Sequence, residues 1–151
     1  MRHGFKTKAE RLAVDARQQL GLGPTDPLQG ARYAAYLGID ILKFDELNLS
    51  EGARRQLLEV DPESWSGMTI KVDGRTGILL NPAHGAERQH NTLAHELSHI
   101  ILGHVPTRVD LGPGGIMLVS EYSEDDEAEA DWLSGALLLP RDALLQCRGG
   151  A

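Results

Sequence analysis

Several protein classes are excluded by what this 151-residue sequence lacks. It contains one cysteine, Cys147, so an internal disulfide framework is impossible and a reducing compartment is expected. No apolar run approaches the ~20 residues that a membrane-spanning helix needs. The first six residues lead into no apolar stretch typical of a signal peptide. We therefore expect a cytoplasmic protein that does not contact a membrane.

Basic residues are also scarce. Lysine and arginine number 15 against 22 aspartates and glutamates, which gives a net charge of −7. Because affinity for the phosphate backbone depends on clustered basic residues, we expect no direct binding to nucleic acid. Much of the negative charge lies between Glu121 and Asp131, where seven carboxylates stand without a basic residue. Apolar residues follow at helical spacing, so this block indicates a helix rather than a disordered tail.

The length and the 41% content of hydrophobic residues predict a single domain over residues 1–151. Hydrophobic periodicity and the breaks at glycine and proline define its expected elements. In chain order these are helices over 6–20 and 27–37, a strand over 39–44, a short helix over 51–60, strands over 68–72 and 76–80, a helix over 86–102, a long loop over 105–122 and a helix over 123–140. The fold class is therefore α+β, with helices packed around a small, mostly antiparallel sheet.

Turn and capping residues support the ends of several elements. Asp73-Gly74 between the two later strands is a strong hairpin signal. Gly103 is expected to end the helix over 86–102. Ser123 is suited to cap the last helix, with Asp126 three residues on as in a capping box, and Pro140 is expected to end it.

The helix over 86–102 carries a motif that indicates a metal site. Residues 95–99 read H-E-L-S-H, an H-E-x-x-H motif. Residues four apart on a helix differ by about 40° in direction, so the imidazoles of His95 and His99 leave the same face one turn apart. Two nitrogens held in this way suit one Zn²⁺ ion. Glu96 points about 100° from His95, which suits a general base that acts on water better than a third ligand.

The last helix offers the third ligand. Glu127 and Asp131 are four apart and share a face at the point where the helix becomes apolar. The carboxylate of Glu127 would complete a His₂Glu catalytic site with one open position. Asp131 would accept the free ring N–H of a ligand histidine and so fix its tautomer. Glu129 lies about 200° from Glu127 around the helix and should point elsewhere.

Three other histidines fit the site less well. A metzincin pattern needs a histidine at position 105, where this chain has Val105. His104 would lie about 180° from His95 on a continued helix, so we expect it to act as a cation at the helix end. His84 and His90 precede the motif near the helix entrance and are expected to have other partners.

Peptide hydrolysis would also need a group that stabilises the oxyanion of the transition state. Tyr122, next to the acidic helix, and His84 are the two candidates that the sequence offers for this role.

Two blocks of the sequence resemble the ImmA/IrrE family of zinc metallopeptidases. Residues 91–104, NTLAHELSHIILGH, resemble the central motif of that family. Residues 127–140, EAEADWLSGALLLP, resemble its second block, E-x-E-A-(N or D), an aromatic-small pair and L-L-(M or L)-P. Leu133-Ser134 stands where the aromatic-small pair is expected. Residues 77–81, with Arg88, resemble the strand that precedes the active-site helix of the family.

The resemblance implies a zincin-like fold in which the active-site helix is followed by a helix that donates a glutamate. It implies one catalytic Zn²⁺ held by His95, His99 and Glu127. It also implies Glu96 as the general base and Asp131 beside a ligand histidine.

The resemblance further implies an intracellular endopeptidase whose protein substrate is a helix-turn-helix repressor of a mobile element or stress response. The alternative is a zinc-binding regulatory protein that inactivates its partner by binding, without proteolysis. A nucleic-acid hydrolase with the same ion is disfavoured by the acidic composition.

Overall fold

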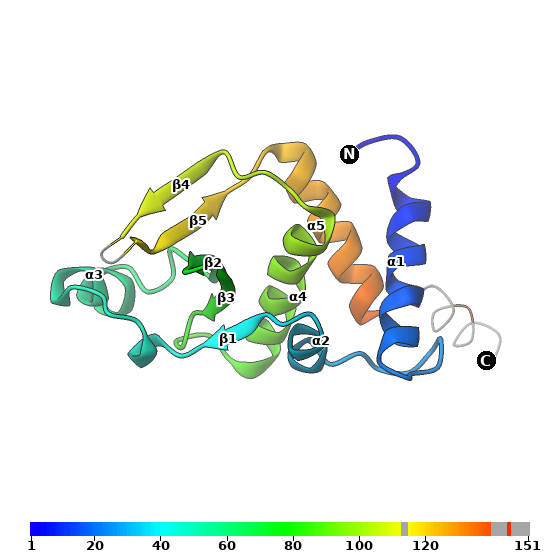
Figure 1. The fold of residues 1–151 in the computed structure, drawn as a ribbon, viewed down its shortest axis with the longest axis horizontal. Coiled ribbons are helices and arrows are strands. Elements are labelled where there is room, and N and C mark those ends of the chain that lie inside the picture. Colours follow the sequence, from blue (N-terminus) through cyan, green and yellow to red (C-terminus); the bar gives the residue numbers. More distant parts are fainter. Residues whose placement is uncertain (113–114, 140–144, 146–151) are drawn as a thin grey trace.

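The computed structural model describes residues 1–112, 115–139 and 145 (Figure 1). Its helices are α1 (Phe5–Gln19), α2 (Gly30–Tyr36), α3 (Glu51–Arg55), α4 (Ala86–Leu102) and α5 (Glu124–Leu138). Its strands are β1 (Asp40–Leu42), β2 (Gly67–Val72), β3 (Arg75–Leu80), β4 (Arg108–Leu111) and β5 (Met117–Glu121). Two single turns complete the list, the 3-10 turn η1 (Phe44–Glu46) and the π-helical turn η2 (Gln56–Val60).

The strands form one sheet in the order β1-β3-β2-β5-β4. β1 and β3 are parallel, and each of the other neighbouring pairs is antiparallel. With the helices around it, this mostly antiparallel sheet confirms the predicted α+β class.

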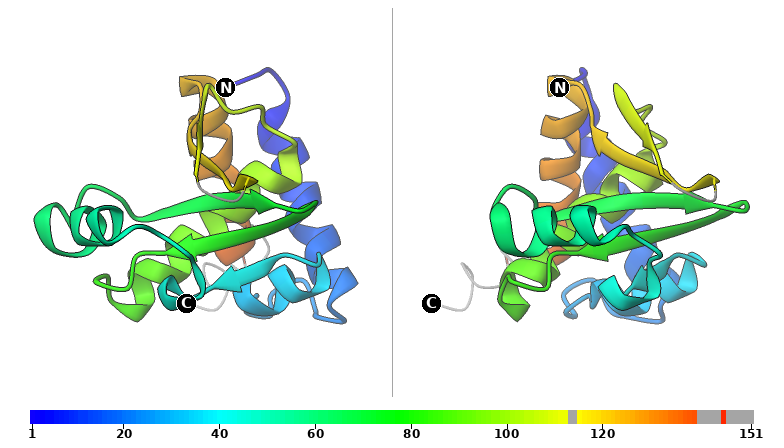
Figure 2. Two further views of the ribbon diagram at one scale, coloured as in Figure 1. Left: turned by 60° about the vertical axis from the view of Figure 1, so that its left-hand side comes forward. Right: turned by 90° about the vertical axis from the view of Figure 1, so that its left-hand side faces the viewer.

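β2 and β3 form the hairpin that Asp73-Gly74 predicts. The φ angles of these two residues are 50° and 75°, the positive pair that a tight hairpin turn of this kind requires. In both views of Figure 2 the hairpin lies next to α4.

Side-chain alternation gives the hairpin two different faces. Thr69 points to α4, where it contacts Glu96. Its partner across the ladder, Ile78, packs in a buried cluster with Leu93 of α4. Ile70, the next residue of β2, points to the opposite face and packs in another cluster, which η1 and η2 help to cover. The hairpin therefore presents a polar group to α4 within an otherwise apolar contact.

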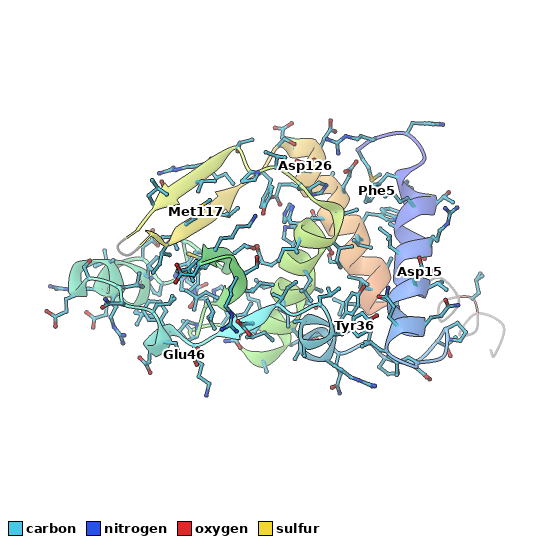
Figure 3. The ribbon with its side chains drawn as sticks, in the orientation of Figure 1. Phe5, Asp15, Tyr36, Glu46, Met117 and Asp126 are labelled. Atoms are coloured by element: carbon cyan, nitrogen blue, oxygen red, sulfur yellow. The ribbon has the colours of Figure 1, made fainter. Side chains whose placement is uncertain are left out.

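α5 lies between α4 and α1 (Figure 1). α1 turns small buried residues, among them Ala9 and Ala13, toward α5, and Leu133 and Leu137 of α5 pack against them. Phe5, at the start of α1, belongs to the same cluster (Figure 3). Small residues on one helix and large ones on the other allow the two helices to pack closely. This packing fixes the position of α5 beside α4.

A buried arginine ties α1 to the end of α5. The Arg17 guanidinium donates hydrogen bonds to the carbonyl oxygens of Leu137 (2.6 Å), Asp26 (3.0 Å) and Ala13 (3.3 Å). Burial lowers the pKa of Arg17, but a guanidinium remains charged at neutral pH. Its bond to Leu137 satisfies a carbonyl in the last turn of α5, which would otherwise lack a partner within the helix.

α4 ends in a Schellman motif at Gly103. The Gly103 N–H donates to the carbonyl of Ile100, and the His104 N–H donates to the carbonyl of His99, both at 3.1 Å. Gly103 has a φ of 64°, a left-handed conformation that is strained for residues with a side chain. The chain therefore leaves the helix after Leu102, where the sequence predicts the end.

Most of the expected elements are present, with some changes at their ends. The helix over 86–102 has the predicted bounds, the helix over 27–37 begins later, at Gly30, and the helix over 51–60 divides into α3 and η2. Ser123 caps α5 as predicted, since its Oγ accepts a hydrogen bond from the Asp126 N–H at 3.2 Å. Pro140 lies outside the described residues. Among the described helices, none has the length and apolar character needed to cross a membrane.

The prediction of a long loop over 105–122 is wrong, because this segment contains β4 and β5. Gly112 and Gly115 lie between two strands that pair with each other, and β5 also pairs with β2. β4 has only four residues, all exposed, so it lacks the apolar alternation by which a strand is usually predicted.

The Schellman motif leads to a prediction for stability. Replacing Gly103 by alanine should lower the free energy of unfolding by about 1–2 kcal/mol, because the added Cβ disfavours the left-handed backbone. A Cβ at this position meets no atom within 4 Å, so the loss would come from the backbone alone. Urea denaturation of the metal-free protein measures it.

The control is Gly135→Ala in the exposed face of α5, where an added Cβ also meets nothing within 4 Å. Its backbone is helical, so alanine should raise the free energy of unfolding by about 0.5–1 kcal/mol. A Gly103→Ala variant as stable as the Gly135→Ala variant would contradict the role given to Gly103.

Candidate metal centre

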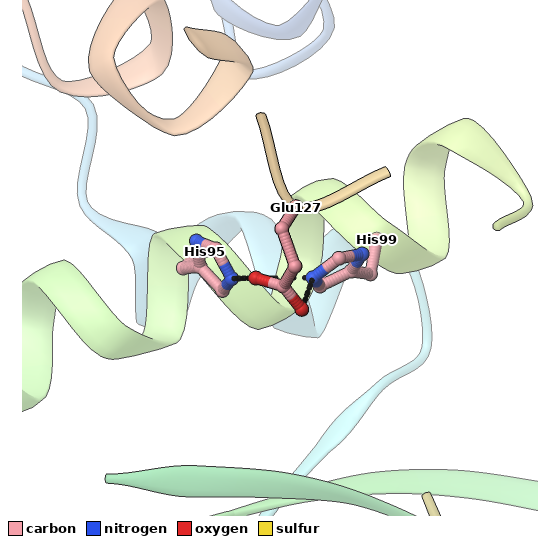
Figure 4. A group of neighbouring side chains, drawn as sticks. All are labelled: His95, His99 and Glu127. Atoms are coloured by element: carbon pink, nitrogen blue, oxygen red, sulfur yellow. Dashed lines mark hydrogen bonds and ion pairs between the residues drawn. The ribbon is translucent and has the colours of Figure 1, made fainter. Parts of the chain in front are cut away.

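α4 and α5 bring three potential metal ligands together. The Nε2 atoms of His95 and His99 are 3.2 Å apart. Glu127 of α5 places Oε2 at 3.0 Å from the His95 nitrogen and Oε1 at 3.3 Å from the His99 nitrogen. Figure 4 shows the carboxylate between the two rings. The two histidines of the H-E-x-x-H motif and Glu127 thus lie together in one cluster of possible ligand atoms.

The distances within this cluster fit a small tetrahedral ion. Ligand atoms that lie ~2.0–2.1 Å from a tetrahedral Zn²⁺ are about 3.3 Å from one another. The two imidazole nitrogens are 3.2 Å apart, and each has one oxygen of the Glu127 carboxylate at 3.0 or 3.3 Å, which is close to that value. Two imidazole nitrogens and one carboxylate oxygen are also the donor set of catalytic zinc sites that leave a fourth position open.

Asp131 lies against the ring of His95. Its Oδ1 lies 3.0 Å from Nδ1 of His95. When Nδ1–H donates to this carboxylate, the lone pair of Nε2 faces Glu127 and the other imidazole. Asp131 therefore lies where the sequence analysis expected it.

His99 is kept neutral by its surroundings. Its side chain is 1% exposed, and the ring of Tyr122 stacks on it with the centroids 3.7 Å apart. Burial, reinforced by the nearby His95 and His104, lowers the pKa of His99 to about 3. Because a metal ligand must be an unprotonated imidazole, His99 is in the binding form at pH 7.

Glu96 stands beside the ligands without being one of them. Its Oε2 accepts a hydrogen bond from the Thr69 hydroxyl at 3.1 Å, so β2 holds one side of the carboxyl group. Burial raises the pKa of Glu96, although the bond from Thr69 and the proximity of His95 oppose the rise. A buried carboxyl group with a raised pKa, of which Thr69 engages only one oxygen, is suited to accept and return a proton.

Tyr122, between β5 and α5, brings a hydroxyl group to the candidate site. Its side chain and that of Thr69 line the same cavity. Burial, together with the charges of Glu96 and Glu127, raises the pKa of Tyr122 to about 12. The phenol therefore keeps its proton at neutral pH and is able to donate a hydrogen bond.

Two cavities, each of about 380 Å³, are lined by residues of the cluster. His95, Glu96 and Glu127 line one of them, together with residues 66–67 and 91–92. His99 and Tyr122 line the other, at the end of α4. The first cavity therefore gives access to the candidate site beside Glu96.

Two of the other residues considered from the sequence lie outside the cluster. The Nε2 atom of His84 is 3.2 Å from Glu63 and 3.4 Å from the Asn81 amide, so the structure does not bring His84 to the ligands. His90, in the first turns of α4, does not belong to the cluster formed by the described residues.

His104 occupies a different place from the one expected. Its side chain is 5% exposed, and Nε2 lies 3.1 Å from Glu129 and 3.5 Å from Asp126. The expectation of a cation at the helix end, facing away from His95, assumed a continued helix, but Gly103 ends the helix and changes the direction of the next residue. Burial alone would raise the pKa of Glu129, but hydrogen bonds from the Arg2 backbone and from His104, with the charge of Arg2, lower it.

The contact of Thr69 and the position of His104 were not predicted from the sequence. Thr69 stands between Met68 and Ile70 in an expected strand, and a polar residue among apolar ones on a buried strand is a signal that it has a buried partner. The contact with Glu96 depends on which face of the hairpin meets α4, and the sequence does not reveal that face.

The ligand cluster leads to a prediction for metal content. The wild-type protein should bind about one Zn²⁺ ion per chain, and His95→Ala and Glu127→Ala should each remove it, because two ligands rarely retain zinc. Equilibrium dialysis followed by elemental analysis measures the content.

Glu124→Ala, which removes an exposed acidic residue from the first turn of the same helix, is the control and should keep the ion. Zinc retained by Glu127→Ala, or lost equally by Glu124→Ala, would show that the ligand assignment is wrong.

Comparison with known proteins gives one match. The model of the Peptidase M78 family, described as the IrrE N-terminal-like domain, matches residues 34–149. This range includes β1 to β5 and both helices that carry the cluster. No curated protein and no solved structure matches the chain significantly.

Proposed function

The chain belongs to the IrrE N-terminal-like family of M78 peptidases, and we propose that it is a zinc-dependent endopeptidase of the cytoplasm. Membership of this family indicates a peptidase of the metallopeptidase type. The identity of the ion, the roles of the residues and the nature of the substrate are the parts that we add. The placement in the cytoplasm follows from the composition, above all from the single cysteine.

The observation that carries the proposal is the position of Glu96. A purely structural zinc site needs ligands and nothing more. Here a second glutamate, Glu96, lies buried next to the ligands, and Thr69 contacts only its Oε2. Burying a carboxyl group has a cost in free energy, which supports a chemical role for this residue.

In the proposed reaction the chain moves one proton through Glu96. Bound zinc would be held by His95, His99 and Glu127, and it supplies a Lewis acid that lowers the pKa of water to about 7 and polarises a carbonyl group. Glu96 accepts the proton of the attacking water on Oε1, the oxygen that Thr69 leaves free. The same oxygen returns the proton to the amine of the departing peptide.

Two further residues orient the reacting groups. Asp131 keeps the His95 ring in its Nδ1–H tautomer, so that Nε2 remains a donor to the ion. Tyr122, protonated at neutral pH, is suited to donate a hydrogen bond to the oxyanion from its place against His99. We do not extend this role to His84, whose partners are Glu63 and Asn81.

For the substrate we propose a protein, namely a helix-turn-helix repressor of a mobile element or stress response. The resemblance of residues 91–104 and 127–140 to the ImmA/IrrE motifs supports this choice. The net charge of −7 also suits a partner with a basic DNA-binding surface, because complementary charge accelerates association. The same charge disfavours direct contact of the enzyme with nucleic acid.

The competing function is inactivation of the partner by binding, without proteolysis. This function would involve the same ion and the same partner, but Glu96 would have no chemical role in it. The two functions therefore differ in what a change at Glu96 does.

Glu96→Gln is the decisive variant. The amide oxygen still accepts the bond from Thr69, so the fold and the zinc content should be retained, while the rate of cleavage should fall about 10²–10⁴-fold with the loss of the base. Mass spectrometry of a helix-turn-helix repressor incubated with zinc-loaded protein measures the cleavage.

Glu124→Gln serves as the control, because it removes the same charge from an exposed position and should cut like the wild type. A Glu96→Gln variant that still cuts would overturn the mechanism. A wild type that binds and inactivates the repressor without cutting it would favour the competing function.

Tyr122→Phe tests the proposed oxyanion donor. It removes one hydroxyl and keeps the ring that stacks on His99, so kcat should fall about 10²–10³-fold while KM and zinc content stay near the wild-type values. Steady-state kinetics on a peptide that spans the cleavage site separates the two constants. An unchanged kcat would remove Tyr122 from the mechanism.

A further inference from the structure

His104 makes a contact with a ligand histidine that the proposed mechanism does not use. Its Nδ1 lies 2.9 Å from Nδ1 of His99, on the side of the ring away from Glu127. The Schellman motif at Gly103 creates this contact by turning the residue after it back against α4. The ring centroids of the two histidines are 5.1 Å apart, in an edge-to-face arrangement.

The positions of the protons in this pair follow from the metal site. When Nε2 of His99 donates its lone pair to an ion, the neutral ring must carry its proton on Nδ1. That N–H faces Nδ1 of His104, which must then accept the bond. His104 in turn must carry its own proton on Nε2, and this N–H points to Oε1 of Glu129 at 3.1 Å. Only this arrangement of protons satisfies all three groups while His99 binds an ion.

The carboxylate at the end of this chain is itself held in place. Glu129 is 3% exposed, and its Oε2 accepts the backbone N–H of Arg2 at 3.2 Å. The guanidinium of Arg2 bridges Glu129 and Asp126, which lies in the first turn of α5 (Figure 3). The acceptor for His104 is therefore a fixed anion rather than a mobile surface group.

The same residues do not form a second metal site. His104, Asp126 and Glu129 have the spacing of a ligand group. However, the cation of Arg2 already lies on both carboxylates, and Nδ1 of His104 is engaged with His99. An additional divalent cation would have to displace the Arg2 guanidinium from the two buried carboxylates.

We propose that His104 and Glu129 are positioning residues that fix the tautomer and orientation of His99 for metal binding. This inference rests on the proposed zinc site and assigns to His99 a support equivalent to the one that Asp131 gives to His95. The two ligand histidines thus use different partners, an exposed carboxylate for His95 and a buried histidine–carboxylate pair for His99.

Three substitutions at His104 separate this role from simple packing. Asparagine places Oδ1 on Cγ, where histidine has Nδ1, so His104→Asn keeps an acceptor for His99. Glutamine places its amide one atom farther out, near Nε2, so His104→Gln fills more space but loses that acceptor. His104→Ala loses both the acceptor and the volume. His90→Asn removes an imidazole from α4 outside the cluster and is the control.

The affinity for Zn²⁺, measured by competition with a chromophoric chelator, is the readout. We expect His104→Ala and His104→Gln to bind zinc about 10–100-fold more weakly than the wild type, as is typical when the partner of a ligand histidine is lost. His104→Asn should stay within about threefold of the wild type, because it supplies the same hydrogen bond to His99. His90→Asn should be unchanged. Wild-type affinity in His104→Gln, or equal losses in His104→Gln and His104→Asn, would overturn the proposal.

A measurement on the wild type avoids any effect of the substitutions on folding. In the zinc-loaded protein with ¹⁵N-labelled histidine, NMR should show His99 protonated on Nδ1 and His104 protonated on Nε2 only. A proton on Nδ1 of His104 would overturn the positioning role while leaving the zinc peptidase intact. Failure of the wild type to bind zinc at all would overturn the proposed function, and the positioning role with it.

Discussion

α4 and α5 pack along one shared face, and the polar groups of the site meet only because this packing holds the two backbones together. α4 contributes both imidazoles and Glu96, and α5 contributes Glu127 and Asp131. Neither helix carries a complete set of ligands. The small residues of α1 and the large ones of α5, with Arg17 at the far end, determine where Glu127 lies. The chemistry of the site therefore depends on an apolar contact on the opposite side of α5.

The surroundings of the cluster assign different states to chemically similar groups. His99 is buried and neutral, whereas His95 is partly exposed and oriented by a carboxylate. Among the acidic residues, Glu127 faces the imidazoles, while Glu96 faces Thr69 in a buried position that raises its pKa. These differences arise from the direction of each side chain and its depth, since the residue types are the same.

Local patterns were sufficient for the parts of the site that lie within one helix. The bounds of α4, the shared face of His95 and His99 and the cap at Ser123 all follow from helical geometry and capping chemistry, which act over a few residues. β4 was missed because an exposed four-residue strand has no periodicity of its own, and its partner β5 was missed with it. The place of His104 depended on one left-handed residue, Gly103, after which a calculation based on a continued helix no longer holds. The contact between Thr69 and Glu96 required knowledge of how the hairpin lies on α4, which is tertiary information.

The division of the ligand atoms between two helices has a consequence for the life of the protein in the cell. Glu127 reaches the imidazoles only while α5 is packed against α1. Under the proposed function, binding of the ion is therefore coupled to the packing of α5. The ion then stabilises the folded protein, and its contribution to the free energy of unfolding grows with the free concentration of the ion. In a cell depleted of the ion, α5 would be detached from α1 in a larger share of the chains, and quality-control proteases would degrade these chains first. The supply of the metal would in this way set the abundance of the protein as well as its activity.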